Sequence, residues 1–227
     1  MPATAKPNFA RRDMLAGVAI TGLLALPGCA SMERRGYVNA VQRLLTLASR
    51  NAFARLTAPD GFWNSAVARI ELPVLFGARG GILKGILTSE PFRQQLQHRL
   101  NTFASEGAKR AAPVVADAVR AIGVENSLAL LRGGPTAATS YLRQQMGPAV
   151  VNAMIPALED AMRIADDPLL GQAISLLAGV NLRDVAHALS LSADNAIWYE
   201  IGNAESEIRA NPEATGDREL IAALRMR

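Results

Sequence analysis

Residues 38–56, VNAVQRLLTLASRNAFARL, decide the fold class. Their apolar positions recur at spacings of three and four residues, which places them on one face of an α-helix. These positions are Val38, Val41, Leu45, Ala48, Ala52 and Leu56. The run ends at Pro59-Asp60-Gly61, a sequence typical of a turn. An amphipathic helix is therefore expected from Val38 to Leu56.

Helical spacing continues through the rest of the chain. Ser89-Glu90-Pro91 predicts a helix start, because proline suits the first turn, and Pro113 is expected to open a further helix. The last clear helix holds Ile197–Ile208. Residues 67–72 alternate in polarity and predict at most one short extended segment. We expect one all-α domain over residues 38–227, with about eight to ten helices.

The first residues have the three-part layout of a bacterial export signal. A basic stretch contains Arg11 and Arg12, and an apolar run from Met14 to Leu26 leads to Cys29. The run is shorter than the roughly 20 residues that span a bilayer, which favours a signal core over a permanent anchor. Residues 1–28 are therefore expected to be a signal peptide.

Cys29 is the only cysteine in the chain, and it lies where signal cleavage must fall. Leu26-Pro27-Gly28-Cys29 resembles a bacterial lipobox, recognised through Leu26 and Gly28, in which the cysteine thiol receives a diacylglyceryl group. A lone thiol after an ordinary signal peptide is the alternative. We expect a lipoprotein anchored through Cys29, with a spacer over residues 29–37.

The signal sequence also indicates the export pathway and the location of the protein in the cell envelope. Arg11-Arg12, followed by Asp13-Met14-Leu15, resembles a twin-arginine export signal, and a general secretory signal is the alternative. Ala30-Ser31 lacks the aspartate that would retain a lipoprotein at the inner membrane. We therefore expect a cell-envelope location, on the outer membrane and facing the periplasm.

Charge and composition argue against a nucleic-acid binder. The chain has a net charge of +4. The signal peptide, residues 1–28, contributes +2 of this charge, through Lys6, Arg11 and Arg12 against Asp13. No basic run interleaved with aromatic residues follows, so phosphate recognition is not expected. Hydrophobic residues make up 50% of the chain, and a single cysteine forms no internal disulfide, so apolar packing must hold the domain.

No catalytic residue, metal ligand or cofactor is predicted, and the protein is not expected to be an enzyme. His98 and His187 lack the spacing of metal ligands and are expected on a solvated face and at a packing boundary. The acidic pairs Glu159-Asp160 and Asp166-Asp167 are expected in solvated turns or helix ends. Glycines between Gly77 and Gly85 are expected to form turns, because no phosphate-loop pattern accompanies them.

The last long helix carries both a charged face and a tryptophan. The charged face, opposite Ile197, is expected to be solvated, with a docking face as the alternative, and it comprises Glu200, Glu205, Glu207 and Arg209. Trp63 and Trp198 are the apolar residues of most interest. Both either pack in the core or line a groove for a lipid or a partner helix.

Three stretches carry a family resemblance. They are Asp60-Gly61-Phe62 with Ile70-Glu71-Leu72-Pro73, then Leu131–Gly134 with Ala137–Arg143, and then Ile197–Pro212. Together they resemble the bacterial domain-of-unknown-function family numbered 4197, over about Val38 to Leu224. The chain departs from the family at Pro135-Thr136, where acidic residues are usual, and in a last helix poorer in lysine. The resemblance implies an exported helical protein and carries no established activity.

Two functions remain open at this point. The leading hypothesis is a noncatalytic envelope protein that binds a protein partner, or acts structurally, from its lipid anchor in the membrane. The alternative is a carrier of an apolar ligand or lipid between the helices. An enclosed apolar pocket above about 300 Å³ would favour the carrier.

Overall fold

The computed structural model describes residues 27–72, 89–123, 126–175 and 179–226, and the regular structure of these residues is entirely helical. The all-α prediction is therefore confirmed. None of the helices within these ranges has both the length and the hydropathy needed to cross a membrane. In chain order, the elements are α1 (Pro27–Leu56), α2 (Gly61–Asn64), α4 (Glu90–Ala121), α5 (Ser127–Arg132), α6 (Ala137–Met146), α7 (Ala149–Ala165), α8 (Pro168–Ser175), α9 (Leu182–Ala210), the 3-10 turn η3 (Pro212–Thr215) and α10 (Arg218–Arg225).

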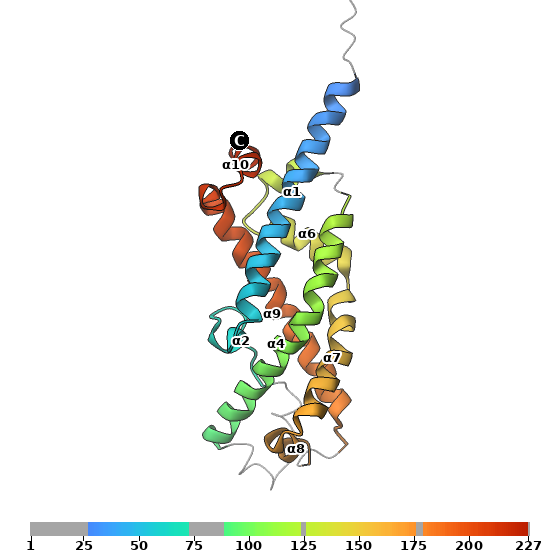
Figure 1. Cartoon of the computed structure of the whole chain (residues 1–227), viewed down its shortest axis with the longest axis vertical. Helices are drawn as coiled ribbons and strands as arrows, with labels where there is room; N and C mark the ends of the chain where they lie inside the picture. Colours follow the sequence, from blue (N-terminus) through green and yellow to red (C-terminus); the bar gives the residue numbers. More distant parts are fainter. Residues whose placement is uncertain (1–26, 73–88, 124–125, 176–178, 227) are drawn as a thin grey trace, which may run out of the picture.

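Four long helices, α1, α4, α7 and α9, run along the long axis of the molecule (Figure 1). α4 packs against α7 and α1, and α9 packs against α1, α7, α4 and α6. Of the short helices, α10 lies towards the start of α1 and α8 lies at the opposite end (Figure 1). α9 therefore has neighbours on several sides.

The predicted stripe of α1 faces the core. Val41, Leu45, Ala48, Ala52 and Leu56 are all fully buried. Burial of a large aliphatic side chain stabilises a fold by about 1.5–3 kcal/mol, so this stripe is a main source of cohesion. The same core cluster includes Leu100 and Val115 of α4, Met154 and Leu158 of α7, and Leu189, Ile197 and Ile201 of α9.

α1 begins earlier than its apolar stripe. The helix starts at Pro27, so residues 29–37, expected as a spacer, continue the helix. Its first turns project beyond the other helices (Figure 1). Among the α1 side chains that the structure describes, from Arg35 on, Tyr37 and Val38 are the first that pack on the core.

The expectation that Pro113 opens a new helix is wrong. Pro113 lies inside the 32-residue helix α4. Proline removes one backbone hydrogen bond, which usually ends or kinks a helix. Here Ala111 and Val115, on either side of it, are both fully buried, and tertiary packing outweighs the local cost.

Residues 67–72 form no strand. The backbone of Ile70 instead pairs with one side chain of α4, that of Asn101. The N–H of Ile70 donates to Asn101 Oδ1 at 2.9 Å, and Asn101 Nδ2 donates to the carbonyl of Ile70 at 2.9 Å. Asn101 is 1% exposed, so a buried amide satisfies both backbone polar groups of Ile70.

The turn from α1 into α2 depends on Gly61. A Cβ atom on Gly61 would lie 2.1 Å from the carbonyl oxygen of Arg55 and 2.6 Å from that of Leu56. Asp60, just before it, has a φ of 54°, in the left-handed region that suits aspartate better than most residues. The Asp60-Gly61 pair therefore lets α2 fold back against the end of α1.

Candidate functional site

A buried ion pair on α9 holds the loop between α5 and α6. Glu205 is 0% exposed, and its Oε1 lies 2.7 Å from Arg209 Nη2. The carboxylate also accepts the N–H of Ala138 at 3.1 Å and of Thr139 at 2.7 Å, at the start of α6. Arg209 donates to the last carbonyls of α5, those of Leu130 and Leu131. Two helix ends are thus satisfied by one side-chain pair.

A second network joins α9 to the end of α1. Glu200 is 3% exposed, and it accepts from Arg55 Nη1 at 3.0 Å and from the Ser65 hydroxyl at 3.1 Å. Arg55 also binds Glu207, and these hydrogen bonds raise the pKa of the Arg55 guanidinium. The prediction of a solvated charged face is therefore wrong for Glu200, Glu205 and Arg209, whose side chains are at most 11% exposed, and it holds for Glu207, half of whose side chain is exposed.

The Asp166-Asp167 turn is only half solvated. The side chain of Asp167 is 3% exposed and pairs with Arg99 of α4. Its Oδ1 accepts the N–H groups of Leu169 and Leu170, which caps α8. Burial by itself would raise the pKa of Asp167, but the hydrogen bonds from Arg99 and Leu170 outweigh it and hold this pKa below its ordinary value.

One open pocket, the Trp63 pocket, lies where α2, α4 and the start of α8 meet. Its volume is about 470 Å³, and it is lined by Trp63, Gln94, Gln95, His98, Arg99, Asp167, Pro168 and Leu169. His98 Nε2 lies 3.0 Å from Asp60 Oδ1, and the His98 ring meets the Trp63 ring edge-on at 4.9 Å. His98 and Arg99 each face a carboxylate, that of Asp60 and that of Asp167.

Trp198 is not among the residues that line this pocket. It is 3% exposed, and its Nε1 donates to Asp194 at 2.9 Å. Burial raises the pKa of Asp194, which also lies 3.2 Å from Arg143. Of the two tryptophans considered for a groove, Trp63 therefore borders a pocket and Trp198 packs in the core.

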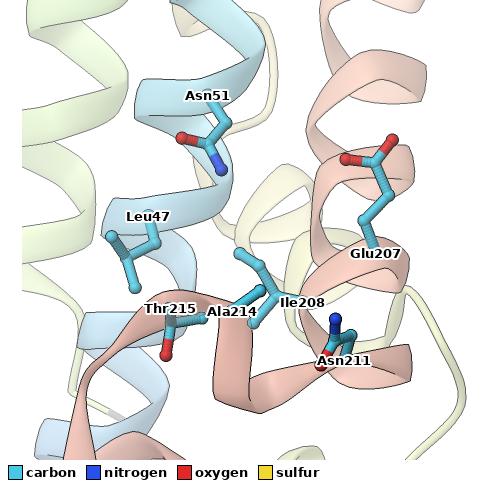
Figure 2. Close-up of a pocket in the computed structure, with 7 residues that line it drawn as sticks. All are labelled: Leu47, Asn51, Glu207, Ile208, Asn211, Ala214 and Thr215. Atoms are coloured by element: carbon cyan, nitrogen blue, oxygen red, sulfur yellow. The ribbon is translucent and has the colours of Figure 1, made fainter.

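A second open pocket, the α1–α9 pocket, lies at the C-terminal end of α9. Its volume is also about 470 Å³, and it is lined by Leu47, Asn51, Glu207, Ile208, Asn211, Ala214 and Thr215. Figure 2 shows Leu47 and Asn51 on α1, with Ile208 and Asn211 opposite them and η3 closing one side. Glu207 and Thr215 are already hydrogen-bonded within the fold. The amino-acid sequence alone does not reveal this pocket, because neither asparagine belongs to a motif of known chemistry.

The structure describes some of the remaining candidate residues and not others. Arg11, Arg12, Leu26 and the glycines from Gly77 to Gly85 lie outside the described residues. Gly28 and Cys29 lie in the first turn of α1. His187, expected at a packing boundary, is exposed. Within the described ranges, no three His, Cys, Asp or Glu residues come together in a way that could hold a metal ion.

Comparison with known proteins identifies a family. A family model described as protein of unknown function (DUF4197) matches residues 31–223. The match covers all the helices described above except the first turn of α1 and the end of α10. No curated protein and no solved structure matches the chain.

Proposed function

We propose that this chain, which belongs to the DUF4197 family of proteins of unknown function, is a lipid-anchored protein of the cell envelope that binds a protein partner without catalysing a reaction. In this proposal, Cys29 carries the lipid, and the helical domain faces the periplasm from the outer membrane. Arg11 and Arg12 direct export by the twin-arginine route.

The observation that carries this proposal is the projecting start of α1. Cys29 lies in the first turn of a 30-residue helix whose first turns project beyond the other helices (Figure 1), and among the α1 side chains that the structure describes, packing on the core begins at Tyr37. At a rise of about 1.5 Å per residue, the helix between Cys29 and Val38 is about 13 Å long. A lipid at that end would therefore not disturb the core, and the domain would stand off the membrane on a short helical stalk.

The physics of anchoring is compatible with this arrangement. One acyl chain binds a bilayer only marginally, whereas a diacylglyceryl group provides two. Each buried methylene contributes about 0.8 kcal/mol, so release from the bilayer becomes negligible. The folded domain needs no lipid contact of its own. The family match supports the same boundary, because it begins two residues after Cys29.

The shape of the pockets favours a partner over a carried lipid. Both the Trp63 pocket and the α1–α9 pocket exceed about 300 Å³, but both are open to solvent and include charged or amide side chains. A carrier needs an apolar cavity that shields its ligand from water. The buried charges of α9 all bind neighbouring helices, which supports a structural role for them rather than a chemical one.

Mass spectrometry of the mature N-terminus tests the anchor. The expected result is a diacylated peptide that begins at Cys29, and its loss in the Cys29→Ser chain. An unmodified N-terminus elsewhere, or a retained residue 1, overturns the proposal. The same measurement on a chain with Arg11→Lys and Arg12→Lys tests the route, where unprocessed precursor is the expected result. Crosslinking in intact cells, with the anchor retained, then tests for a partner.

A further inference from the structure

We infer that the α1–α9 pocket binds an extended peptide segment without acidic side chains through Asn51 and Asn211, with one aliphatic side chain of that segment on Leu47 and Ile208. This inference rests on the proposed partner-binding function and names the kind of partner segment. Some polar groups of the pocket are already hydrogen-bonded within the fold, and others are not.

Most polar groups of the pocket already have partners in the fold. Glu207 accepts from Asn203 at 3.0 Å and from Arg55, and the hydrogen bond from Arg55 holds the pKa of Glu207 below its ordinary value. The carboxylate is therefore ionised at neutral pH, and its cationic partner Arg55 is shared with Glu200. Thr215 Oγ1 donates to the carbonyl of Pro212 at 2.7 Å and accepts the N–H of Asp217.

The two asparagines differ from these groups. Both side chains are exposed, and neither amide has a hydrogen-bond partner within the part of the chain that the structure describes. They lie on separate walls of the pocket, Asn51 on α1 and Asn211 at the end of α9 (Figure 2). Between them lies an aliphatic floor, which Leu47, Ile208 and Ala214 form.

An asparagine amide matches a peptide unit. It offers N–H donors and one carbonyl acceptor, and a peptide unit offers the complementary acceptor and donor. This chain already uses the pairing, since Asn101 binds both the N–H and the carbonyl of Ile70 at 2.9 Å. Asn51 and Asn211 offer the same chemistry to a segment from outside the chain.

The same features select an extended segment over other ligands. A helix satisfies its own N–H and carbonyl groups, so a docked helix would leave both amides without partners. An anionic ligand is disfavoured, because the ionised Glu207 lines the pocket and its partner Arg55 is shared with Glu200. A sugar ring is best held against an aromatic face, and this floor is aliphatic.

Peptide selection on the full-length chain tests the inference. The chain, solubilised in mild detergent, is immobilised and screened with a random peptide library displayed on phage. The expected peptides share one aliphatic position and lack acidic neighbours. Their affinity should fall about 3- to 10-fold in Asn51→Ala and again in Asn211→Ala, the loss typical of one or two hydrogen bonds. Asn152→Ala, an exposed asparagine on α7, is the matched control and should change nothing.

Several results would overturn the inference. They are a selection that enriches no peptide, peptides that bind the asparagine variants as tightly as the original chain, and retention of oligosaccharides in their place on a glycan array. The anchor and the partner are measured separately. A diacylated Cys29 and an envelope partner still captured by the Asn51→Ala/Asn211→Ala chain would leave the proposed function standing while removing this site.

Discussion

Glu205→Ala should lower the free energy of unfolding by about 3–5 kcal/mol, because removing one member of a buried ion pair leaves the other charge unpaired. Glu205 is 0% exposed, and the side chain of Arg209 is only 11% exposed. Water therefore cannot replace the missing carboxylate at the guanidinium without opening the fold. The N–H groups of Ala138 and Thr139 lose their acceptor in the same step.

The magnitude follows from these separate losses. Each buried donor left without an acceptor costs about 1–3 kcal/mol. The costs do not simply add, because the start of α6 can shift towards water, and groups in one network are coupled. Glu205→Gln keeps the shape of the side chain and one acceptor oxygen. It should therefore cost less than Glu205→Ala, about 1.5–3 kcal/mol, the value of a hydrogen bond to a charged group.

Urea unfolding followed by circular dichroism at the helical band measures these losses. Glu106→Ala is the control, since Glu106 pairs with Lys109 at 2.7 Å but is 48% exposed. Such a surface pair contributes about 0–1 kcal/mol. Equal losses for Glu205→Ala and Glu106→Ala, or a loss below about 1 kcal/mol for Glu205→Ala, would refute the structural role of the buried pair.

Two further predictions concern the ends of the bundle. Gly61→Ala should destabilise the fold by more than about 2 kcal/mol, because the added Cβ would lie 2.1 Å from a backbone oxygen. Gly134→Ala is the control, and it should change the thermal midpoint little because Gly134 has open space around it. Asp167 has its pKa lowered in the fold, so its ionised form stabilises the fold above the unfolded value of about 3.9, and this stability is lost as the pH falls through the lower folded value. Asp167→Asn should therefore cost stability at pH 7 and progressively less towards pH 3 in urea titrations, and a cost that does not change with pH would contradict the ionised role.

The helices could be predicted from the sequence because their signal is local. The apolar stripe from Val41 to Leu56 fixes which face of α1 is buried, whatever packs on it. Asn181 and Asp184 form a reciprocal cap at the start of α9, and both groups lie within one turn of each other. Such features depend on neighbours along the chain, so reading the sequence is enough to find them.

The buried charges could not be predicted, because their environment comes from distant segments. α9 contacts α1, α4, α6 and α7, so even the side of the helix opposite Ile197 is partly covered. A glutamate on that side must then find a partner inside the protein. Glu200 finds Arg55, 145 residues earlier, and Glu205 binds the start of α6. Amphipathic spacing records which side is apolar and does not record how many neighbours a helix has.

The α1–α9 pocket was beyond sequence reading for the same reason. Asn51 and Asn211 lie on different helices and come together only through the packing of α1 on α9. Asparagine is common on solvated helix faces, so neither residue is conspicuous alone. Trp63, which the sequence did single out, borders a pocket whose other walls come from α4 and the start of α8.

The stretches that carry the family resemblance mostly maintain the fold. Gly61 permits the turn after α1, Ile70 is held by Asn101, and the loop from Leu131 to Thr139 is held by Glu205 and its partner. Family membership therefore reports architecture, and it gives no reason to look for chemistry at these positions. Function should be sought where a residue of the same stretches is exposed and has no role in packing. Asn211 meets that condition, because its side chain is exposed, caps no helix and lines the α1–α9 pocket.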